Sequence, residues 1–585
     1  MGKKQASVSR TTTSNQTSPQ GQPNQQDGIE FALFAPYNEK VELIGDFSEW
    51  SPIPMVKGDD GWWRTRVPLG DGDHLYKFRV KSLSYFAKGE TLEVFDPYAL
   101  HVTADEHENA IARIINGKRT WTSYQWKHDD VPLPRNDELN IYELFVGDFG
   151  GSAERRGTFQ DVIAKLDELK GLGFNGVELM PVKFFPGGKG WGYNLRSLFG
   201  VASVYGSADE LCQLVDECHA RGMRLIIDGV YNHADADAPL AKIDYAYWFY
   251  EQNPDPPTMQ WGPKFNYGHY DENLKLFPAR KYVIESIRFW VETFHIDGIR
   301  FDATRAIANF DALRELCTAA FDAVAGRKPF LTVAEHVPED PAITGFPDGP
   351  FVAAWRFSLG AYFRAVLTGQ YDDGQSPEDF DGFLNALDPA KNGYRTGGNC
   401  VNYLVSHDHD RLMHQLGDKA HMFDDVAFAR VRLGFGIVAT IPGIPMTWMG
   451  QEFGAAEEKT LEPRPLDWSL LKNERNANLR DHVKGLFQLR RESPALRGDQ
   501  FEICFRDPGR KAFAFKRWND AGGVIVVAVN LKHDPSGEIT IANCGLEDGT
   551  WHEHTNNYNA TVSGGILKDQ LGPSEVKIFV KTAAS

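Results

Sequence analysis

The chain has 585 residues, several times the length of an ordinary domain, so two to four domains with ample buried core are expected. It carries 62 basic and 80 acidic residues and no basic block, which argues against nucleic acid and anionic membrane as partners and favours a neutral ligand. No apolar run reaches the roughly 18 to 20 residues needed to cross a bilayer.

The cysteines and the first 27 residues indicate the cellular compartment of the protein. The six cysteines are scattered, with no C-x-x-C pair and no metal-like cluster with histidine, so free thiols in a reducing compartment are expected. Residues 1–27 are mostly Ser, Thr, Gln, Asn and Pro and lack the apolar core of a secretory signal, which predicts a disordered tail. Together these features predict a cytoplasmic protein, and they leave its oligomeric state open.

Residues 28–117 consist of short alternating runs broken by turn signals, among them FALFAPY, KVELIGDF and HLYKFRV. This spacing predicts an antiparallel β-sandwich. Three tryptophans, Trp50, Trp62 and Trp63, could stack on a sugar or could be core residues of the sandwich. The sequence leaves both interpretations open.

From Asn140 onward, strand-like segments alternate with amphipathic helical segments. NIYELFV precedes TFQDVIAKLDELKGLG, and NGVELMPV precedes ADELCQLVDECHARG and MRLIIDGVYNH. The strand-like runs are nearly continuous in apolar residues, as in strands that are covered on both faces. Repeated units of this kind over more than three hundred residues indicate a (β/α)8 barrel or a doubly wound sheet, and no phosphate or dinucleotide fingerprint is present.

The segment HIDGIRFDATRAI, at 295–307, is the centre of the chemistry. A helix is predicted just before it, because apolar residues recur at three- and four-residue steps in PARKYVIESIRFWVETF. In the strand 298–302, alternation places Arg300 and Asp302 on the same side. A buried guanidinium next to a carboxylate keeps that carboxylate ionised, as a nucleophile requires. The alternative for R-x-D alone is a purely structural ion pair.

Polar residues also end the other apolar runs of the predicted barrel. Asp228 is followed by Asn232 and His233, Glu335 ends the run FLTVAE, and His407 and Asp408 follow VNYLVS. Functional residues of a (β/α)8 barrel lie at the carboxyl ends of its strands. Four strands that deliver acids or imidazoles to one rim predict a shared active site.

Two carboxyl groups, one ionised and one protonated, are the minimum for cleaving a glycosidic bond. Asp302 is expected to be the ionised group, and desolvation after FLTVA is expected to keep Glu335 protonated. A separation of about 5–5.5 Å would imply a covalent glycosyl-enzyme and retention. Asp408 and His407 would then bind sugar hydroxyls as the ring flattens.

Four motifs carry a family resemblance: DGVYNH at 228–233, GIRFDATRAI at 298–307, AEH at 334–336 and SHD at 406–408. In order and spacing they resemble the signature regions of the α-amylase superfamily, glycoside hydrolase family 13. WGYN at 191–194 resembles the segment after the second barrel strand. The resemblance implies that Asp302 is the nucleophile, Glu335 the acid/base and Asp408 the transition-state stabiliser. It also implies substrate contacts at Tyr193, Asp228, His233, Arg300 and His407.

The flanking segments agree with this resemblance. Residues 28–117 resemble a family-48 carbohydrate-binding module, and PGIPMTWMGQEFG resembles the eighth barrel strand of the family. The predicted organisation is an α/β fold in which a (β/α)8 barrel at 118–497, with a short insertion at about 232–277, lies between two β-domains. The second of these, at 498–585, is an antiparallel β-domain.

The resemblance implies an α-glucan or malto-oligosaccharide substrate and a retaining enzyme. Transfer of the cleaved chain to form α-1,6 branches is the leading expectation. The alternatives are hydrolysis, either of α-amylase type or as a malto-oligosyltrehalose trehalohydrolase, and a non-catalytic glucan-binding protein. No cofactor and no metal site are predicted. Calcium is left open, because Asp235, Asp237 and Asp244 near Asn232 could be ligands or a solvated acidic loop.

Overall fold

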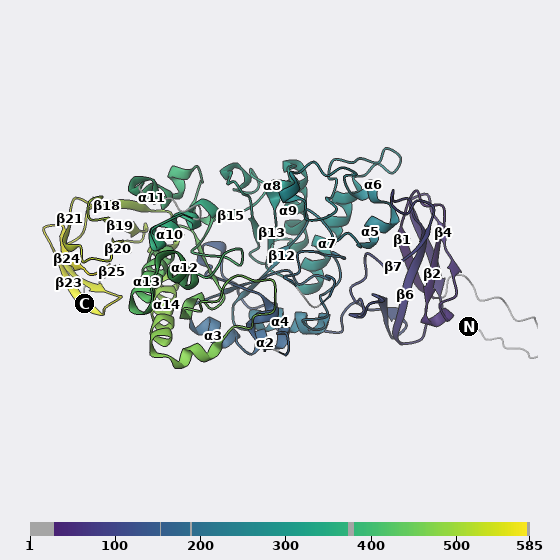
Figure 1. The fold of residues 1–585 in the computed structure, drawn as a ribbon, viewed down its shortest axis with the longest axis horizontal. Helices are drawn as coiled ribbons and strands as arrows, with labels where there is room; N and C mark the ends of the chain where they lie inside the picture. Colours follow the sequence, from purple (N-terminus) through teal and green to yellow (C-terminus); the bar gives the residue numbers. More distant parts are fainter. Residues whose placement is uncertain (1–27, 153, 188–189, 372–378, 582–585) are drawn as a thin grey trace, which may run out of the picture.

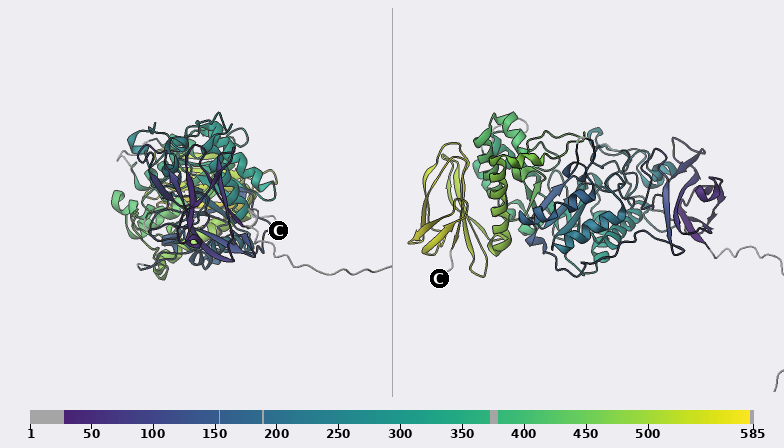
Figure 2. Two further views of the ribbon diagram at one scale, coloured as in Figure 1. Left: turned by 90° about the vertical axis from the view of Figure 1, so that its right-hand side faces the viewer. Right: turned by 90° about the horizontal axis from the view of Figure 1, so that it is seen from below.

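The computed structural model describes residues 28–581 except 153, 188–189 and 372–378. The predicted disordered tail, 1–27, lies outside the described residues. The molecule is elongated, with the amino-terminal strands at one end, the carboxyl-terminal strands at the other and a barrel with its helices between them (Figure 1 and Figure 2). Within the part of the chain that the structure describes, no helix combines the length and the apolar character needed to span a bilayer.

Two antiparallel sheets face one another at the amino-terminal end. One has the order β1-β5-β4, and the other has the order β3-β2-β6-β8-β9 with β7 on β6. Phe31 of β1 contacts Tyr76 of β6, with ring centroids 4.8 Å apart, so apolar rings fill the space between the sheets. The strands are β1 Ile29–Phe34, β2 Val41–Gly45, β3 Ile53–Pro54, β4 Val56–Lys57, β5 Trp62–Val67, β6 Gly72–Lys81, β7 Thr91–Val94, β8 Ala110–Ile115 and β9 Lys118–Arg119.

The three tryptophans of this end differ in exposure. Trp63 is buried, and its indole N–H donates to the carbonyl of Ala35 at 2.9 Å. Trp62 is half-buried and packs on Tyr98, with ring centroids 5.5 Å apart. Trp50 is 41% exposed. Among the three, Trp50 is the one whose ring is exposed enough to stack on a sugar. Trp63 is a core residue of the sandwich, which is one of the two interpretations that the sequence left open.

Eight parallel strands close into the barrel, with β10 pairing β17 to complete the ring. This confirms the expected (β/α)8 architecture. The strands are β10 Ile141–Leu144, β11 Gly176–Leu179, β12 Arg224–Gly229, β13 Gly298–Phe301, β14 Leu331–Ala334, β15 Ala353–Trp355, β16 Cys400–Tyr403 and β17 Ile444–Trp448. Every residue of all eight strands is buried, as their nearly continuous apolar runs predicted.

Helices surround the barrel and connect its strands (Figure 1). They are α1 Val146–Phe149, α2 Phe159–Ile163, α3 Leu166–Gly171, α4 Ala208–Ala220, α5 Pro239–Ile243, α6 Tyr245–Trp248, α7 Pro278–Phe294, α8 Thr304–Ile307, α9 Phe310–Val324, α10 Phe357–Thr368, α11 Phe380–Ala386, α12 Leu412–Ala420, α13 Asp424–Thr440, α14 Glu474–Glu492 and α15 Pro494–Arg497. The single helix expected in TFQDVIAKLDELKGLG is divided into α2 and α3. Gly173, just after α3, has φ +99°, and a Cβ there would lie 2.8 Å from the Cβ of Phe487, so this turn favours glycine.

Helix α7 positions the central strand β13. Val283, Ile287, Trp290 and Phe294 are buried on one face, at the three- and four-residue steps seen in the sequence. His295 ends the helix in the left-handed conformation, at φ 50°, and the chain turns into β13 three residues later. This face belongs to the same hydrophobic core as Ile299 and Phe301 of β13.

An eight-stranded antiparallel sheet forms the carboxyl-terminal end, with the order β18-β19-β20-β25-β22-β23-β24-β21. One face packs against the barrel helices, because Phe513, Phe515 and Val527 belong to the main hydrophobic core. The other face has a smaller core of its own around Trp551. The strands are β18 Phe501–Asp507, β19 Ala512–Trp518, β20 Val524–Asn530, β21 Gly537–Ile541, β22 Gly549–Glu553, β23 Tyr558–Ser563, β24 Ile566–Leu571 and β25 Val576–Lys581.

The cysteines are free thiols, and all but one are buried. They are Cys212, Cys218, Cys317, Cys400, Cys504 and Cys544.

Candidate active site

Arg300 organises the rim of the barrel. Its side chain is buried, and its guanidinium forms ion pairs with three carboxylates from three neighbouring strand ends. The distances are 2.7 Å to Asp228 at the end of β12, 2.9 Å to Asp302 after β13 and 2.8 Å to Glu335 after β14. In-register pairing places Asp228 directly beside Arg300. Three acids predicted from strand ends therefore meet at the charge of Arg300.

The shared guanidinium changes the expected ionisation of the pair. Burial and the nearby Glu335 carboxylate raise the pKa of Asp302 well above its ordinary value, and the positive charge of Arg300 opposes this only in part. The expectation that Arg300 holds Asp302 ionised was therefore wrong in its simple form, because one positive charge faces three negative ones. Two carboxylates that share a site cannot both ionise freely, so the cluster holds a proton.

His407 and Asp408 lie on the other side of the same rim, after β16. The Nε2 atom of His407 lies 2.8 Å from the hydroxyl of Tyr193 and 3.5 Å from Asp408. The Tyr193 hydroxyl also donates to Asp228 at 2.7 Å, which links this group to the Arg300 cluster. The predicted residues are thus joined by direct contacts across the barrel mouth.

Glu143, on β10, was not predicted. Its carboxylate lies 2.6 Å from Nδ1 of His407. The sequence showed only a single acid inside the apolar run NIYELFV, which was assigned to a strand without a chemical role. The available signal was the cost of burying a charge, because an acid inside a fully buried strand needs a partner.

An open cleft of about 770 Å³ lies over these residues, and Asp302, Glu335, His407, Asp408, Tyr193 and His233 all line it. His233 is buried, and burial lowers its pKa to about 4, so its ring is neutral. Neither ring nitrogen has a partner among the described residues, so His233 can bind a ligand hydroxyl.

Exposed apolar side chains form the walls of the cleft. Trp261 is 46% exposed and lies next to His233, with ring centroids 5.8 Å apart, while Phe357 lies next to His409. Trp261 comes from the WGPKFNY segment after β12, and Phe357 begins α10. Neither was predicted as a site residue, because a single aromatic residue in a loop gives no periodic signal. Apolar walls with a few convergent polar groups are typical of a small-molecule or sugar site.

Two stretches of the chain match known families. Residues 135–341 match the family described as alpha amylase, catalytic domain, and residues 17–99 match carbohydrate-binding module 48, the isoamylase N-terminal domain. The first stretch runs from before β10 to beyond β14, so it contains the Arg300 cluster. This stretch is a glycoside hydrolase family 13 catalytic domain. It confirms the family resemblance and contains three of the four strand-end motifs, all but SHD at 406–408.

Curated relatives similar to this family 13 enzyme over most of its length are 1,4-alpha-glucan branching enzymes. The one from Nitrosomonas eutropha is 27% identical over 584 residues, which cover 92% of this chain and 76% of that protein. The one from Marinobacter nauticus is also 27% identical and covers 93% of this chain and 89% of that protein.

Solved structures show the same fold. Pullulanase type I from Bacillus subtilis, complexed with maltose, has a TM-score of 0.77 at 18% identity and covers 96% of this chain and 86% of that chain. An alpha-amylase from Geobacillus thermoleovorans, complexed with acarbose, has a TM-score of 0.65 at 21% identity and covers 77% of this chain and 100% of that chain. These likenesses confirm the expected fold class.

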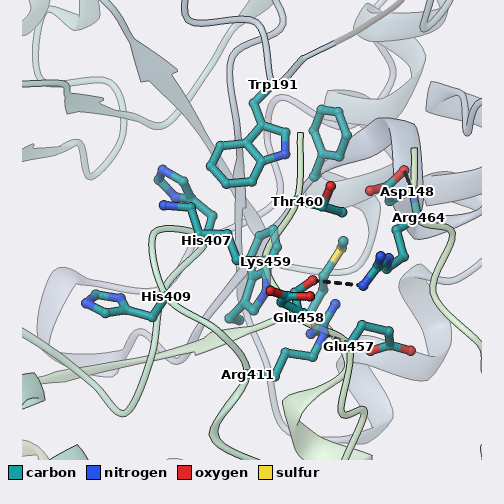
Figure 3. A pocket seen from close by; sticks show the side chains of 13 residues that line it. Asp148, Trp191, His407, His409, Arg411, Glu457, Glu458, Lys459, Thr460 and Arg464 are labelled. Carbon is teal, nitrogen blue, oxygen red and sulfur yellow. Dashed lines mark hydrogen bonds and ion pairs between the residues drawn. The ribbon is translucent and has the colours of Figure 1, made fainter. Parts of the chain in front are cut away.

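The loop after β17 closes one side of the cleft of this family 13 enzyme. The ammonium of Lys459 donates to the backbone carbonyl of Asp408 at 2.8 Å, lies 3.6 Å from its carboxylate and lies 5.2 Å from the ring centre of Trp191. Figure 3 shows a small second pocket that this loop lines with Glu457, Glu458, Lys459 and Thr460, together with His407 and Trp191. The loop therefore adds a positive charge next to Asp408.

Two of the three acids considered for calcium are engaged in ion pairs. Asp235 pairs with Arg196 at 3.1 Å, and Asp237 pairs with Lys242 at 3.1 Å, so cationic side chains already occupy the positions that an ion would take. The side-chain oxygen of Asn232 is buried and has no partner among the described residues. Across 28–581 without the gaps noted above, no group of three His, Cys, Asp or Glu side chains is arranged to hold a metal ion.

Proposed function

We propose that this enzyme cleaves α-1,4-glucosidic bonds of an α-glucan through a covalent glycosyl-enzyme and transfers the cleaved chain to a sugar 6-hydroxyl, which creates an α-1,6 branch. The observation that carries the proposal is the placement of Asp302 and Glu335 on one buried guanidinium at the floor of the cleft. Two carboxyl groups that touch one guanidinium are close together. This suits retaining enzymes, at about 5–5.5 Å, better than inverting ones, at about 6.5–9.5 Å.

In the first step, a carboxylate oxygen of Asp302 attacks the anomeric carbon of the glucose at the cleavage point. The bond between that carbon and the glycosidic oxygen breaks, and Glu335 gives its proton to the leaving oxygen. The step needs one proton on the pair, and the crowding of three carboxylates around Arg300 supports the retention of one. The proton must reside on Glu335 when the substrate is bound.

In the second step, an acceptor hydroxyl attacks the same carbon and releases Asp302. Glu335, now ionised, takes the hydroxyl proton and returns to its starting state. If the acceptor is a sugar 6-hydroxyl, the product is a branch, whereas water gives hydrolysis. The printed names of the relatives, 1,4-alpha-glucan branching enzyme, support the sugar acceptor. The apolar walls at Trp261 and Phe357 also support it, because they offer surface for a second glucan chain.

The rest of the rim supports the charge that develops in the sugar ring. Asp408, His407 and Tyr193 converge on the same cleft, where hydrogen bonds to ring hydroxyls can strengthen as the oxocarbenium ion forms. Burial raises the pKa of Asp408, but the basic groups His407, Arg300 and Lys459 lower it by more, so that the pKa falls to about 2. The lowered pKa favours the ionised form of Asp408 at neutral pH.

The test is to incubate amylose with the enzyme and follow two quantities in one tube. One is the number of reducing ends, and the other is the amount of short chains that an α-1,6-specific debranching enzyme releases afterwards. Releasable chains without a matching rise in reducing ends support transfer to a sugar hydroxyl. Rising reducing ends without new branches would overturn the branching proposal and make the enzyme an α-glucan hydrolase.

A further inference from the structure

Glu143 gives His407 a buried carboxylate partner on its far side from the cleft. One carboxylate oxygen lies 2.6 Å from Nδ1 of the ring, and the other accepts the backbone N–H of His407 at 3.3 Å. Both side chains are 2% exposed. Glu143 therefore holds the ring and the start of the loop after β16 at the same time.

The opposite nitrogen of His407 faces hydrogen-bond acceptors. The Tyr193 hydroxyl has one proton, which it donates to Asp228 at 2.7 Å. Its remaining lone pairs can only accept, so the 2.8 Å contact with Nε2 requires a proton on that nitrogen. Asp408, at 3.5 Å from Nε2, is also an acceptor. Because Nδ1 faces a carboxylate as well, both ring nitrogens must donate, which only the imidazolium can do.

We propose that Glu143 is a positioning residue for the glycosyl-transfer site: it holds His407 as a doubly protonated imidazolium and, through that charge, keeps Asp408 ionised and aimed at the sugar hydroxyls. The inference deepens the proposed function, since it assigns the device that prepares the transition-state stabiliser of the same site. Glu143 touches neither the cleft nor the substrate, so its effect passes through His407.

The surrounding charges agree with this role. Burial alone lowers the pKa of His407, but Asp408 and Glu143 raise it to about 9, against a smaller opposing effect of Arg300. Burial raises the pKa of Glu143 above its ordinary value, and His407 offsets that rise only in part.

Glu178 is a further buried acid, paired in register with Glu143 on β11. Burial and Glu143 raise the pKa of Glu178 well above its ordinary value, which favours its neutral form. Glu143, at 2.6 Å, is the acid in direct contact with Nδ1.

The test compares Glu143→Gln with Glu178→Gln in the full-length enzyme. Glutamine keeps the shape and an acceptor for Nδ1 but removes the charge. We expect Glu143→Gln to lower kcat on malto-oligosaccharides by about 10- to 100-fold, because a charge-assisted hydrogen bond is lost, while KM changes little. Since His407 then loses its proton at lower pH, the alkaline limb of the kcat–pH profile moves to lower pH.

Glu178→Gln is the matched control, because it is an equally buried acid on the neighbouring strand that is already neutral. It should leave the alkaline limb in place. An unshifted limb in Glu143→Gln, or an equal shift in both variants, would overturn the proposal.

A measurement on the native protein separates this inference from the proposed reaction and from any folding defect. In protein labelled with ¹⁵N-histidine, the His407 signals, assigned by their loss in His407→Gln, should show both ring nitrogens protonated at pH 7.5. A neutral ring would overturn the positioning role, whatever reaction the enzyme performs. A protonated ring together with failure of the amylose assay would contradict only the branching proposal.

Discussion

Replacing Asp302 by Asn should stabilise the folded enzyme while abolishing activity. In the native cluster, the charge of Asp302 is attracted by Arg300 and repelled by the carboxylates of Asp228 and Glu335. The attraction to Arg300, with charges about 4 Å apart in a medium of effective dielectric constant about 20, amounts to about 4 kcal/mol. Asp228 and Glu335 bind the same guanidinium, so their charges lie about 5 Å away and repel by about 3 kcal/mol each. At a pH high enough to ionise all three carboxyl groups, removing the charge of Asp302 therefore relieves about 2 kcal/mol.

The effect of this substitution on stability depends on pH. Because the folded-state pKa of Asp302 is raised, the group favours folding below its unfolded pKa, and its penalty grows as the pH rises through the folded value. The advantage of Asp302→Asn over the native enzyme should thus increase from pH 5 to pH 9. A relief of about 2 kcal/mol corresponds to roughly 1–2 °C in melting temperature for a chain of this size.

Asp297→Asn is the matched control, because it is also a fully buried aspartate. Burial raises its pKa, but Lys328, His219 and Arg224 lower it from 3.8 to about 2. A depressed folded pKa contributes stability above the unfolded value that is lost as the pH falls through about 2, and here it amounts to about 2 kcal/mol. Asp297→Asn should therefore lower the melting temperature.

The assay is thermal unfolding followed by circular dichroism at one fixed scan rate, at several pH values between 5 and 9. Activity measured on the same samples should be lost in Asp302→Asn. If Asp302→Asn lowers the melting temperature as Asp297→Asn does, the argument that the three carboxylates repel one another around Arg300 is refuted.

Two further changes test the tryptophans and the walls of the cleft. Trp63→Ala should destabilise the enzyme by about 3–5 kcal/mol, because it empties a buried site. Trp50→Ala should change the melting temperature by no more than about 1 °C, because its ring is largely exposed. Equal losses of stability would show that the two rings do not differ in burial. Trp261→Ala or Phe357→Ala should raise the share of turnovers that end in hydrolysis, since each ring covers cleft surface that water then reaches. The measurement is the ratio of reducing ends to chains released by the debranching enzyme. An unchanged ratio would show that these rings do not contribute to the acceptor site.

The parts of the fold that follow from periodicity could be predicted from the sequence. The buried face of α7 and the polar residues at the ends of β12, β13, β14 and β16 lie where local patterns place them, because a helix face and a strand end are defined within a few residues. The barrel then brings the strand ends together without further information.

Pairing across the barrel could not be predicted in the same way. The segment IYEL does not indicate that Glu143 contacts His407, which is 264 positions away. That contact depends on the order of the strands around the closed barrel. The ionisation of Asp302 was misjudged for a similar reason. The sequence showed Arg300 two residues from Asp302, but not that Asp228 and Glu335 share the same guanidinium.

The boundaries 28–117, 118–497 and 498–585 stay predictions, as do the chemical roles assigned to the individual rim residues. The structure supplies the positions on which those roles depend. Their test requires the reaction itself.

In the proposed reaction, Asp302 becomes covalently bonded to the donor sugar. The most direct measurement is to react the enzyme with a fluorinated glucosyl fluoride, which forms the glycosyl-enzyme quickly and releases it slowly, then to digest the protein and map the added mass by mass spectrometry. The account predicts one sugar on the peptide that contains Asp302. A label on the peptide of Glu335 or Asp228, or inversion of the anomeric centre without any label, would contradict it.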